Sequence, residues 1–472
     1  MTVAPPSVEA AAAAPSAATG WRGAVARLAD ERFAASAGVV ALAALVVRLV
    51  LARFEPLPPS RTPFADEVWY VRVAHNVLLG RGFTSPYFPY RAPTALHAPL
   101  TVILLLPAGL LEPYGYTAQR STMAIVGALA VLAIAFAAKE LAGPRVGLVA
   151  GALAAVYPGL WVNDLVATSE SPAVLLLATT LLLALRYRRE PTGRRLVLLG
   201  LLVGLLALTR AELSILGLLL VVPTVLATTR ASARRVLDAV RSLAVVGVLA
   251  VAVVAPWTAY NAARFHQFVP VSTDLGQTLL GANCPPSYYG PLTGYDSLTC
   301  WEPVFAKVIR EHPHNNEAQY DGYFRQAAVS YAVHHWHRWP IVAVMREAYL
   351  WSLWRPGETV LTSAYYLGRA DWISWAQIAG FWLLTPFAVY GFVLARRRRL
   401  PRWQLVTMVA FAAAVGMLIT PHLRYRIPAE IAWVLLGAVA LDRILFGAPG
   451  AERLASTSDE TVSVGGGDLD LR

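Results

Sequence analysis

The 472-residue sequence contains little charge, two cysteines and only two lysines, Lys139 and Lys307. Charged residues make up 15% of the chain and hydrophobic residues 57%, whereas soluble domains carry roughly 25% charged residues. Together with long apolar runs, this composition excludes an ordinary soluble, disordered or collagen-like protein and indicates a polytopic membrane protein. The cysteines, Cys284 and Cys300, are too few for a disulfide framework or a zinc site. They allow one disulfide if their segment faces an oxidising compartment.

Familiar catalytic motifs are absent as well. The sequence has no glycine-rich nucleotide loop, no HExxH motif and no nucleophile elbow. The net charge of +11 comes from arginines in short clusters between apolar runs, which is the positive-inside pattern of membrane proteins and not a nucleic-acid footprint. Residues 1–20 lack the basic start and apolar core of a cleaved signal peptide. Like 447–472, they have the composition of a disordered tail.

Apolar runs and basic clusters together predict the topology. A span needs about 20 helical residues, but the run 98–111 is short and contains Pro99 and Pro107. If 98–111 does not cross, every basic cluster lies in the cytoplasm, so we interpret it as juxtamembrane or re-entrant. The charged stretch 341–355 is interpreted as interfacial. The ten remaining runs are 36–53, 119–138, 145–160, 171–185, 195–208, 211–228, 243–259, 374–395, 403–420 and 428–446. The basic clusters are Arg186–Arg195, Arg230–Arg241, Arg396–Arg402, and Lys139 with Arg145.

We therefore predict an all-α polytopic fold with about ten transmembrane helices, juxtamembrane helices in the outer loops, and both termini in the cytoplasm. The predicted parts are a cytoplasmic tail (1–35), an N-terminal transmembrane module (36–259) with the first outer loop (54–118), a long outer loop (260–373), C-terminal transmembrane helices (374–446) and a second cytoplasmic tail (447–472).

Two adjacent acids, Asp66 and Glu67, begin an amphipathic helix just after the first apolar run. Val68, Val71 and Ala74 follow at helical spacing, so the helix is predicted to lie on the membrane surface. There the acids would meet a substrate that enters from the lipid. The alternative is that they only complement the helix dipole.

Further acids lie in the next outer turns. Glu170 opens a helix ahead of Pro172, and Asp164 is nearby. An ionisable residue at a membrane-helix end is a functional candidate, and a capping acid is the alternative. Arg210 lies in a very short turn, where it either pairs with Glu212 or faces an anion.

The last outer turn carries two arginines and a tyrosine, Arg424, Tyr425 and Arg426, on the side of the membrane where the positive-inside rule disfavours basic residues. Snorkelling anchors are the alternative, but a bound anion accounts better for arginines on this side. Arg91 and His97 are weaker members of the outer polar set. Acids together with arginines suit group transfer from a membrane-embedded phosphate ester, because a base activates a hydroxyl and arginines hold the leaving phosphate.

With these residues in place, the sequence resembles the C-type (GT-C) integral-membrane glycosyltransferases, in particular the bacterial members akin to protein O-mannosyltransferases and lipid A aminoarabinose transferases (glycosyltransferase family 39-like). The resemblance covers roughly residues 40–445. The motifs that carry it, in family order, are Asp66-Glu67-Val68-Trp69-Tyr70, His97-Ala98-Pro99-Leu100, Glu170-Ser171-Pro172, Leu208-Thr209-Arg210, Ala255-Pro256-Trp257 with Tyr260-Asn261 and then Phe268-Val269-Pro270-Val271-Ser272-Thr273, and Arg424-Tyr425-Arg426-Ile427-Pro428-Ala429.

The resemblance implies an inverting transfer of a hexosyl or pentosyl group from a polyprenyl-phosphate donor to a hydroxyl acceptor on the outer face of the cytoplasmic membrane. Asp66 would be the base, with Glu67 and Glu170 shaping the acceptor and sugar site. Relatives often have Asp where Glu170 stands, so the second acid is either Glu170 or Asp164. The implied donor-phosphate ligands are Arg210, Arg424, Tyr425 and Arg426. The further substrate contacts that it implies are Tyr70, Arg72, Arg91, His97 and Asp164.

The implied partners are the lipid-linked donor, the lipid bilayer and an acceptor hydroxyl on a glycan, lipid or protein, with no nucleic acid. No cofactor or metal is expected beyond the lipid-linked sugar, although a divalent cation stays open. Two alternatives remain at this stage. A transporter or flippase of lipid-linked sugars would use the same arginines without a base, although the sequence lacks the internal repeat typical of transporters. A non-catalytic scaffold would need no cavity beside Asp66.

Overall fold

A computed structural model describes residues 21–55, 65–87, 91–113, 115–229 and 234–447 of the chain. Within these ranges the regular elements are helices, and one isolated β-bridge joins Thr84 to Pro93. The all-α prediction is therefore confirmed. Both predicted disordered tails, apart from Gly447, lie outside the described residues, as does part of the second basic cluster. Inside the predicted tail 1–35, α1 (Trp21–Glu31) forms a helix that packs against α2 and α6.

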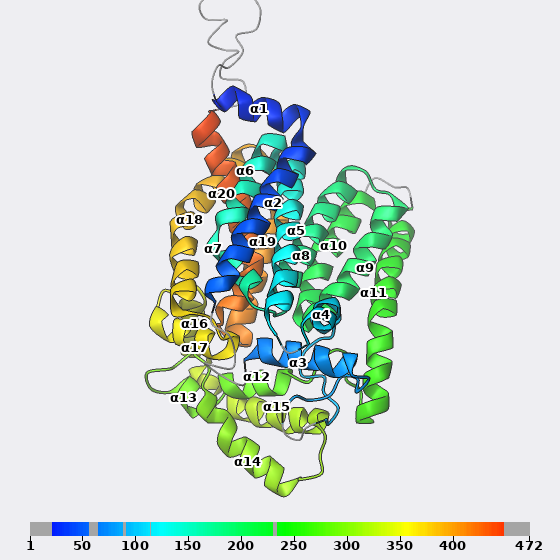
Figure 1. Cartoon of the computed structure of the whole chain (residues 1–472), viewed down its shortest axis with the longest axis vertical. Coiled ribbons are helices and arrows are strands. Elements are labelled where there is room, and N and C mark those ends of the chain that lie inside the picture. Colours follow the sequence, from blue (N-terminus) through cyan, green and yellow to red (C-terminus); the bar gives the residue numbers. More distant parts are fainter. Residues whose placement is uncertain (1–20, 56–64, 88–90, 114, 230–233, 448–472) are drawn as a thin grey trace, which may run out of the picture.

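Each of the ten predicted apolar runs is helical, and these helices run side by side along the long axis of the molecule (Figure 1). Between α6 and α8, the chain turns through the short helix α7 (Pro158–Trp161) and the 3-10 helix η2 (Val162–Leu165). The helices of this bundle are α2 (Phe33–Leu51), α5 (Thr117–Ala142), α6 (Pro144–Val156), α8 (Glu170–Arg189), α9 (Gly193–Thr209), α10 (Ala211–Thr229), α11 (Arg235–Phe265), α18 (Asp371–Arg397), α19 (Trp403–Leu418) and α20 (Ile427–Phe446).

Six helices among the described residues are long and apolar enough to cross a membrane, or up to seven if the bent pair Pro144–Val156 and Pro158–Leu165 is one span. The predicted count of about ten spans is therefore not confirmed. One of the ten predicted spans, the bundle helix α19, has 16 residues and is apolar but shorter than these six helices. The chain thus has the helix composition of a polytopic membrane protein.

A second layer covers one end of the bundle, at the bottom of Figure 1. In it, α3 lies across the bundle axis, and α4 is seen end-on in the same view. The run 98–111 thus does not run parallel to the bundle, although Pro107 lies inside α4 without ending it. The α-helices of this layer are α3 (Asp66–Leu78), α4 (Leu100–Leu111), α12 (Leu275–Ala282), α13 (Pro285–Tyr288), α14 (Trp301–Glu311), α15 (Glu317–His334), α16 (Trp339–Leu350) and α17 (Pro356–Leu367). The remaining 3-10 helices are η1 (Ala52–Phe54), η3 (Leu298–Cys300), η4 (Trp336–Arg338) and η5 (Leu423–Arg426).

The apolar face of α3 packs on protein. Val68 and Val71 are buried in the interface of α3 with its neighbours, and Trp69 packs in a cluster with Val102 and Leu105 of α4. The sequence predicts, from this apolar stripe, that the helix lies on the membrane surface. In the structure α4 folds back against α3 and covers much of the stripe. These contacts hold α3 against the end of the bundle.

Small residues allow the bundle helices to approach closely. A Cβ atom at Gly391 of α18 would lie 1.8 Å from the carbonyl oxygen of Leu436 on α20. A Cβ atom at Gly127 of α5 would lie 2.0 Å from a carboxylate oxygen of Asp164. Close packing through small residues is the usual way in which membrane helices associate. These two glycines therefore leave room for a neighbouring backbone and for a buried charge.

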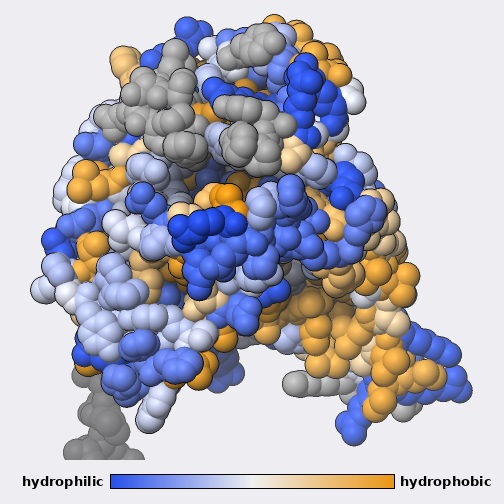
Figure 2. Space-filling view, turned by 90° about the horizontal axis from the view of Figure 1, so that it is seen from below, coloured by the Kyte–Doolittle hydropathy of each residue, from blue (hydrophilic) through white to orange (hydrophobic). Residues whose placement is uncertain are grey.

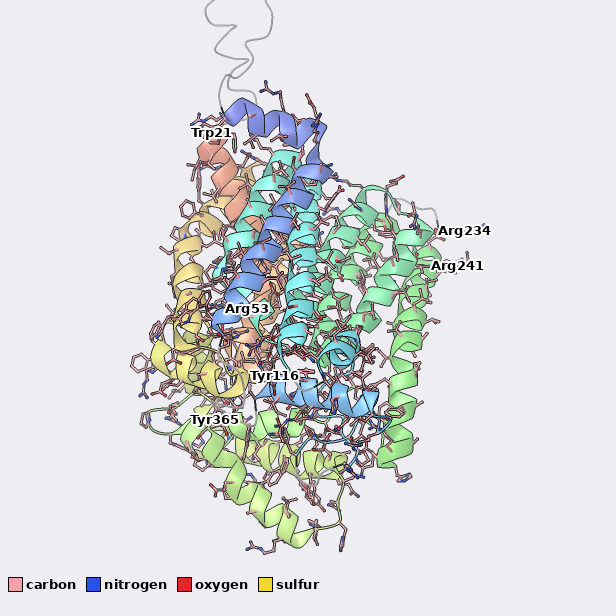
Figure 3. The ribbon with its side chains drawn as sticks, viewed as in Figure 1. Trp21, Arg53, Tyr116, Arg234, Arg241 and Tyr365 are labelled. Carbon is pink, nitrogen blue, oxygen red and sulfur yellow. A yellow bond between two sulfur atoms is a disulfide. The ribbon has the colours of Figure 1, made fainter. Side chains whose placement is uncertain are left out.

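The two ends of the bundle carry different side chains. Arg234 and Arg241 lie at the end opposite α3, whereas Tyr116 and Tyr365 lie at the end that α3 covers (Figure 3). Seen from below, that covered end is largely hydrophilic, and hydrophobic side chains gather on the right, where Figure 1 places α9–α11 (Figure 2). Arg234 and Arg241 therefore lie at the end opposite the polar helical layer, as the predicted topology requires.

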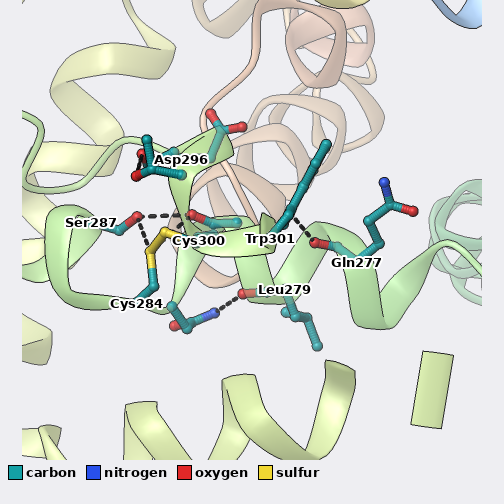
Figure 4. The surroundings of a disulfide bond; sticks show 12 residues. Gln277, Leu279, Cys284, Ser287, Asp296, Cys300 and Trp301 are labelled. Carbon is teal, nitrogen blue, oxygen red and sulfur yellow. Dashed lines mark hydrogen bonds between the residues drawn. A yellow bond between two sulfur atoms is a disulfide. The ribbon is translucent and has the colours of Figure 1, made fainter. Parts of the chain in front are cut away.

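A disulfide joins Cys284 and Cys300 in the layer that covers the bundle end (Figure 4). Their Cα atoms lie 6.0 Å apart. The enclosed segment holds Asp296, which is 3.0 Å from the Nε2 atom of His422 and accepts a hydrogen bond from Tyr366. The disulfide thus closes a loop that touches the turn before η5.

Replacing both cysteines with serine is expected to lower the stability of this layer by about 3 kcal/mol, because closing a loop of this length restricts the unfolded chain. Melting temperatures in detergent, with and without a reducing agent, measure the effect. Since the sequence has two cysteines, a reducing agent should destabilise the native protein and leave the double serine variant unchanged. An equal shift in both proteins would contradict the assignment.

Candidate active site

Asp66 and Arg424 form an ion pair at the polar end of the bundle. Asp66 is the first residue of α3, and Arg424 belongs to η5, and an NH1 group of Arg424 donates to Oδ2 of Asp66. Their side chains are 14% and 11% exposed. Burial alone would raise the pKa of Asp66, but Arg424 and His97 outweigh burial and hold that pKa well below its usual range. Asp66 is therefore a carboxylate at neutral pH.

His97 lies between two carboxylates. Its Nε2 atom is 3.6 Å from Oδ1 of Asp66, and its Nδ1 atom is 3.9 Å from Oδ2 of Asp274. Tyr70 stacks on the imidazole at 5.0 Å, and Trp69 meets its face edge-on at 4.8 Å. Burial lowers the pKa of His97, but Asp66 and Asp274 more than offset this effect, so the net shift is upward.

Arg210 and Arg424 both lie against Tyr425. The guanidinium of Arg210 is 4.8 Å from the centre of that ring, and the guanidinium of Arg424 is 5.6 Å away. Arg210 also donates to Glu170 at 3.0 Å and to Glu212 at 2.7 Å. The sequence left open whether Arg210 pairs with Glu212 or faces an anion. The structure shows the pair and places the same guanidinium beside the second arginine.

A small cavity adjoins this arginine pair. Its volume is ≈ 10 Å³, about the space that one water molecule needs. Arg210, Glu212, Arg424 and Tyr425 form its polar wall, and α10 and α19 provide apolar side chains. The apolar lining residues of these two helices are Leu213, Phe411 and Val415. The cavity therefore lies between the two arginines and the apolar side chains of α10 and α19.

Glu67 points away from Asp66. Both of its carboxylate oxygens accept hydrogen bonds from Arg120 on α5, at 2.9 and 2.7 Å, and one also accepts from the backbone N–H of Ala167 at 2.8 Å. The side chain is fully buried. Its contacts hold α3 against α5 and the turn before α8. Glu67 thus sets the position of Asp66 without facing the arginine pair.

Two other predicted residues are held elsewhere. Asp164 accepts from Nε of Arg48 at 2.6 Å, in a pair that is almost completely buried. Arg426 donates to Glu430 at 2.6 Å, and both side chains are inaccessible. The structure therefore brings Glu170, and not Asp164, to the arginine pair, and separates Arg426 from Arg424.

Two predicted substrate contacts are exposed. Arg72 lies on the outer face of α3, and Arg91 has an exposed side chain and a positive φ of 67° in the following loop. The distances that define the cluster around Asp66 involve neither of them. The structure therefore assembles Asp66, Tyr70, His97, Glu170, Arg210, Arg424 and Tyr425, and adds Asp274 and Glu212.

Sequence analysis missed Asp274 and Arg120. Asp274 directly follows the motif Phe268–Thr273, and this position beside a family motif was the one signal in the sequence; in the structure it is the residue before α12. Arg120 stands alone at the start of α5, and nothing in the local sequence marks it as the partner of Glu67. Among the described residues, no group of three or more His, Cys, Asp or Glu side chains is arranged to hold a metal ion.

Residues 111–260 match the family model of the dolichyl-phosphate-mannose-protein mannosyltransferases. The match covers less than half of the chain and includes Glu170 and Arg210, but neither Asp66 nor Arg424. It confirms, over those residues, the predicted resemblance to the C-type glycosyltransferases. No curated protein matches the sequence significantly.

Solved structures that are similar to this chain include AglB and ArnT. The oligosaccharyltransferase AglB of Archaeoglobus fulgidus, in complex with an inhibitory peptide and a dolichol-phosphate, is 17% identical with a TM-score of 0.47, over 91% of this chain and 52% of that one. ArnT of Cupriavidus metallidurans, bound to undecaprenyl phosphate, is 16% identical with a TM-score of 0.43, over 89% of this chain and 80% of that one. The chain thus spans about half the length of the oligosaccharyltransferase.

Proposed function

We propose that this protein is a membrane glycosyltransferase that moves a sugar from a polyprenyl-phosphate donor to a hydroxyl acceptor, with inversion at the anomeric carbon. The observation that carries the proposal is the ion pair of Asp66 with Arg424, because it puts a carboxylate base beside a cation that has a second arginine as its neighbour. The matching family is described by a dolichyl-phosphate-linked sugar donor, which supports a lipid phosphate as the leaving group.

In the proposed reaction, the acceptor oxygen attacks the anomeric carbon, and the bond from that carbon to the phosphate oxygen breaks. The electron pair of that bond stays on the phosphate, whose new charge Arg424 and Arg210 stabilise. The acceptor proton passes to Asp66. Tyr425 contacts both guanidinium groups, whose carbons lie 4.8 Å and 5.6 Å from the centre of its ring. Donor binding must open the pair of Asp66 with Arg424, because the adjoining cavity has room for about one water molecule.

The apolar side of the cavity suits the polyprenyl chain. Leu213 of α10 and Phe411 and Val415 of α19 line it, and the buried phosphate ligands lie at its polar end. We propose that the sugar-bearing end of the donor faces the polar helical layer and that the lipid tail leaves between these helices. The arginine-rich turn at the other end supports an active site on the outer face of the cytoplasmic membrane, with both termini inside.

The decisive experiment incubates the purified protein with a panel of polyprenyl-phosphate sugars and hydroxyl acceptors, and measures sugar transfer and release of the polyprenyl phosphate. Transfer with inversion is expected. A chelator series in the same assay tests for a divalent cation. Lipid scrambling by the protein in liposomes, with no transfer from any donor, would instead favour a transporter of lipid-linked sugars.

Replacing Arg424 with lysine is expected to raise the KM for the donor by about 10- to 100-fold, because lysine cannot form the two-pronged contact that arginine makes with a phosphate. Steady-state kinetics against donor concentration measures the change. Arg72→Lys is the matched control, since Arg72 is an exposed arginine of the same layer. A donor KM that is equal in the two variants would contradict the phosphate-binding role.

A further inference from the structure

We propose that His97 and Asp274 form a relay that carries the acceptor proton from Asp66 toward solvent. The inference rests on the proposed function and adds two residues to its chemistry. Its basis is the placement of the imidazole, whose two nitrogen atoms each face a different carboxylate: Nε2 faces Asp66 at 3.6 Å and Nδ1 faces Asp274 at 3.9 Å. A histidine between a base and a second carboxylate can take a proton on one nitrogen and release one from the other.

The imidazole is held in this orientation by its surroundings. Tyr70 stacks on it with an interplanar angle of 21°, and Trp69 packs at 83°. Both aromatic residues come from α3, the helix that also carries Asp66. The imidazole of His97 therefore packs on the helix that carries Asp66, and this packing fixes the direction of its two nitrogen atoms relative to Asp66.

Glu317 at the start of α15 joins the two segments that bear His97 and Asp274. Its carboxylate accepts from Thr94 Oγ1 at 2.7 Å, from the backbone N–H of Ala95 at 2.8 Å and from Thr273 Oγ1 at 2.5 Å. The backbone N–H of Thr273 also donates to the carbonyl of Ala95 at 2.9 Å. These contacts fix the loop before α4 beside the residue that precedes α12. The proximity of His97 to Asp274 is thus built by three separate parts of the chain.

The surroundings of Asp66 explain why a relay is needed. Before the donor binds, Arg424 and His97 hold the pKa of Asp66 well below its usual range. After the donor phosphate takes Arg424, His97 still faces Asp66 at 3.6 Å and is the group to which its proton passes. Burial raises the pKa of Asp274, and its side chain is 30% exposed. A proton that passes from Asp66 through His97 to Asp274 therefore reaches a partly exposed carboxylate, from which water can take it.

The proposed step starts with neutral His97, whose Nδ1–H points to Asp274. The acceptor hydroxyl loses its proton to Asp66 as its oxygen bonds to the anomeric carbon. That proton passes to Nε2 of His97, and the resulting imidazolium lies between two carboxylates. The Nδ1 proton then passes to Asp274 and on to water. No oxidant, reductant or further reactant is consumed.

Other charged groups around His97 set its titration. Asp66 and Asp274 favour the imidazolium, whereas Arg424 disfavours it. Glu317 of α15 is a further carboxylate that interacts with His97. Because the raised pKa keeps His97 protonated at lower pH, the relay works only above that pKa. The rate should therefore rise with pH as His97 loses its proton.

The test compares Asp274→Asn with the native enzyme. Asparagine can still precede α12, because it is a good helix-capping residue. The expected result is a kcat lower by about 10²-fold, an unchanged donor KM, and an acid limb of the kcat profile that shifts to lower pH, because His97 loses one of its two carboxylates. His97→Gln should lower kcat by a similar factor, and the double variant should lower kcat no more than either single variant does.

Glu347→Gln is the control, because it removes a half-buried carboxylate of α16 that accepts a hydrogen bond from Nε1 of Trp351 at 2.8 Å. Multiplicative losses in the double variant, or an unshifted acid limb in Asp274→Asn, would overturn the relay while leaving the glycosyltransferase proposal intact. Native protein that transfers no sugar would instead overturn the proposed function. Nitrogen NMR of the nine histidines, with His97→Gln for assignment, reports independently of activity whether Asp274→Asn lowers the pKa of His97.

Discussion

Replacing Asp66 with asparagine is expected to reduce sugar transfer by about 10³-fold, because the acceptor hydroxyl loses the base that takes its proton. Asparagine has nearly the same shape as aspartate but cannot accept that proton. The substitution also frees Arg424 from its carboxylate partner. We therefore expect donor binding to stay as strong or to become stronger while kcat falls. Single-turnover transfer rates and direct binding of the donor measure these two effects separately.

Glu302→Gln is the matched control for this experiment, because Glu302 is an exposed carboxylate of α14 in the same layer. Its transfer rate should equal that of the native protein. A folded Asp66→Asn protein with native kcat would remove Asp66 from the chemistry. A fall in donor binding together with unchanged kcat would instead assign Asp66 to the organisation of the phosphate site.

Replacing Arg120 with methionine is expected to destabilise the protein by about 3–5 kcal/mol, because it leaves the carboxylate of Glu67 buried without its cation. The pair has side-chain exposures of 4% and 0%, so water cannot replace the lost partner. The double variant Glu67→Gln with Arg120→Met removes the buried charge, so most of the lost stability should return. Unfolding in detergent, followed by thermal or denaturant titration, measures the difference.

Arg325→Met provides the comparison for a surface pair. Arg325 is 52% exposed and lies 3.5 Å from Asp321, so its removal should cost about 0–1 kcal/mol. If Arg120→Met cost no more than Arg325→Met, the pair with Glu67 would not hold α3 in place. If the double variant were as unstable as Arg120→Met, loss of packing and not the unpaired charge would be the cause.

The fold was largely accessible from local patterns. Every predicted apolar run became a helix, because a backbone in lipid must satisfy its hydrogen bonds within its own segment. The run 98–111 was separated from the others by its length, its prolines and the distribution of arginines, and α4 indeed lies across the bundle axis (Figure 1). The span count was less accessible, since several bundle helices are short or carry charge at their ends.

The site was accessible only in part, as Asp66 and Glu67 illustrate. The two acids are adjacent in sequence, but consecutive residues of a helix point about 100° apart. One therefore faces Arg424 and the other Arg120. Arg424 and Arg426 separate in the same way, because residues two apart do not share a face. Residue type alone could not distinguish Asp66 from Glu67 or Arg424 from Arg426, because the difference within each pair comes from the elements that pack on each face of the helix.

The sequence by itself determined that the chain is a bundle of apolar helices, because hydropathy acts locally along a chain. It also placed the acids, and the arginines that depart from the positive-inside rule, in the turns at one end of that bundle. Only the tertiary structure decided which of those charges meet. Asp66, His97, Asp274 and Arg424 come from four distant segments, and long-range packing of helices, braced by Glu317 and by the pair of Glu67 with Arg120, brings them together.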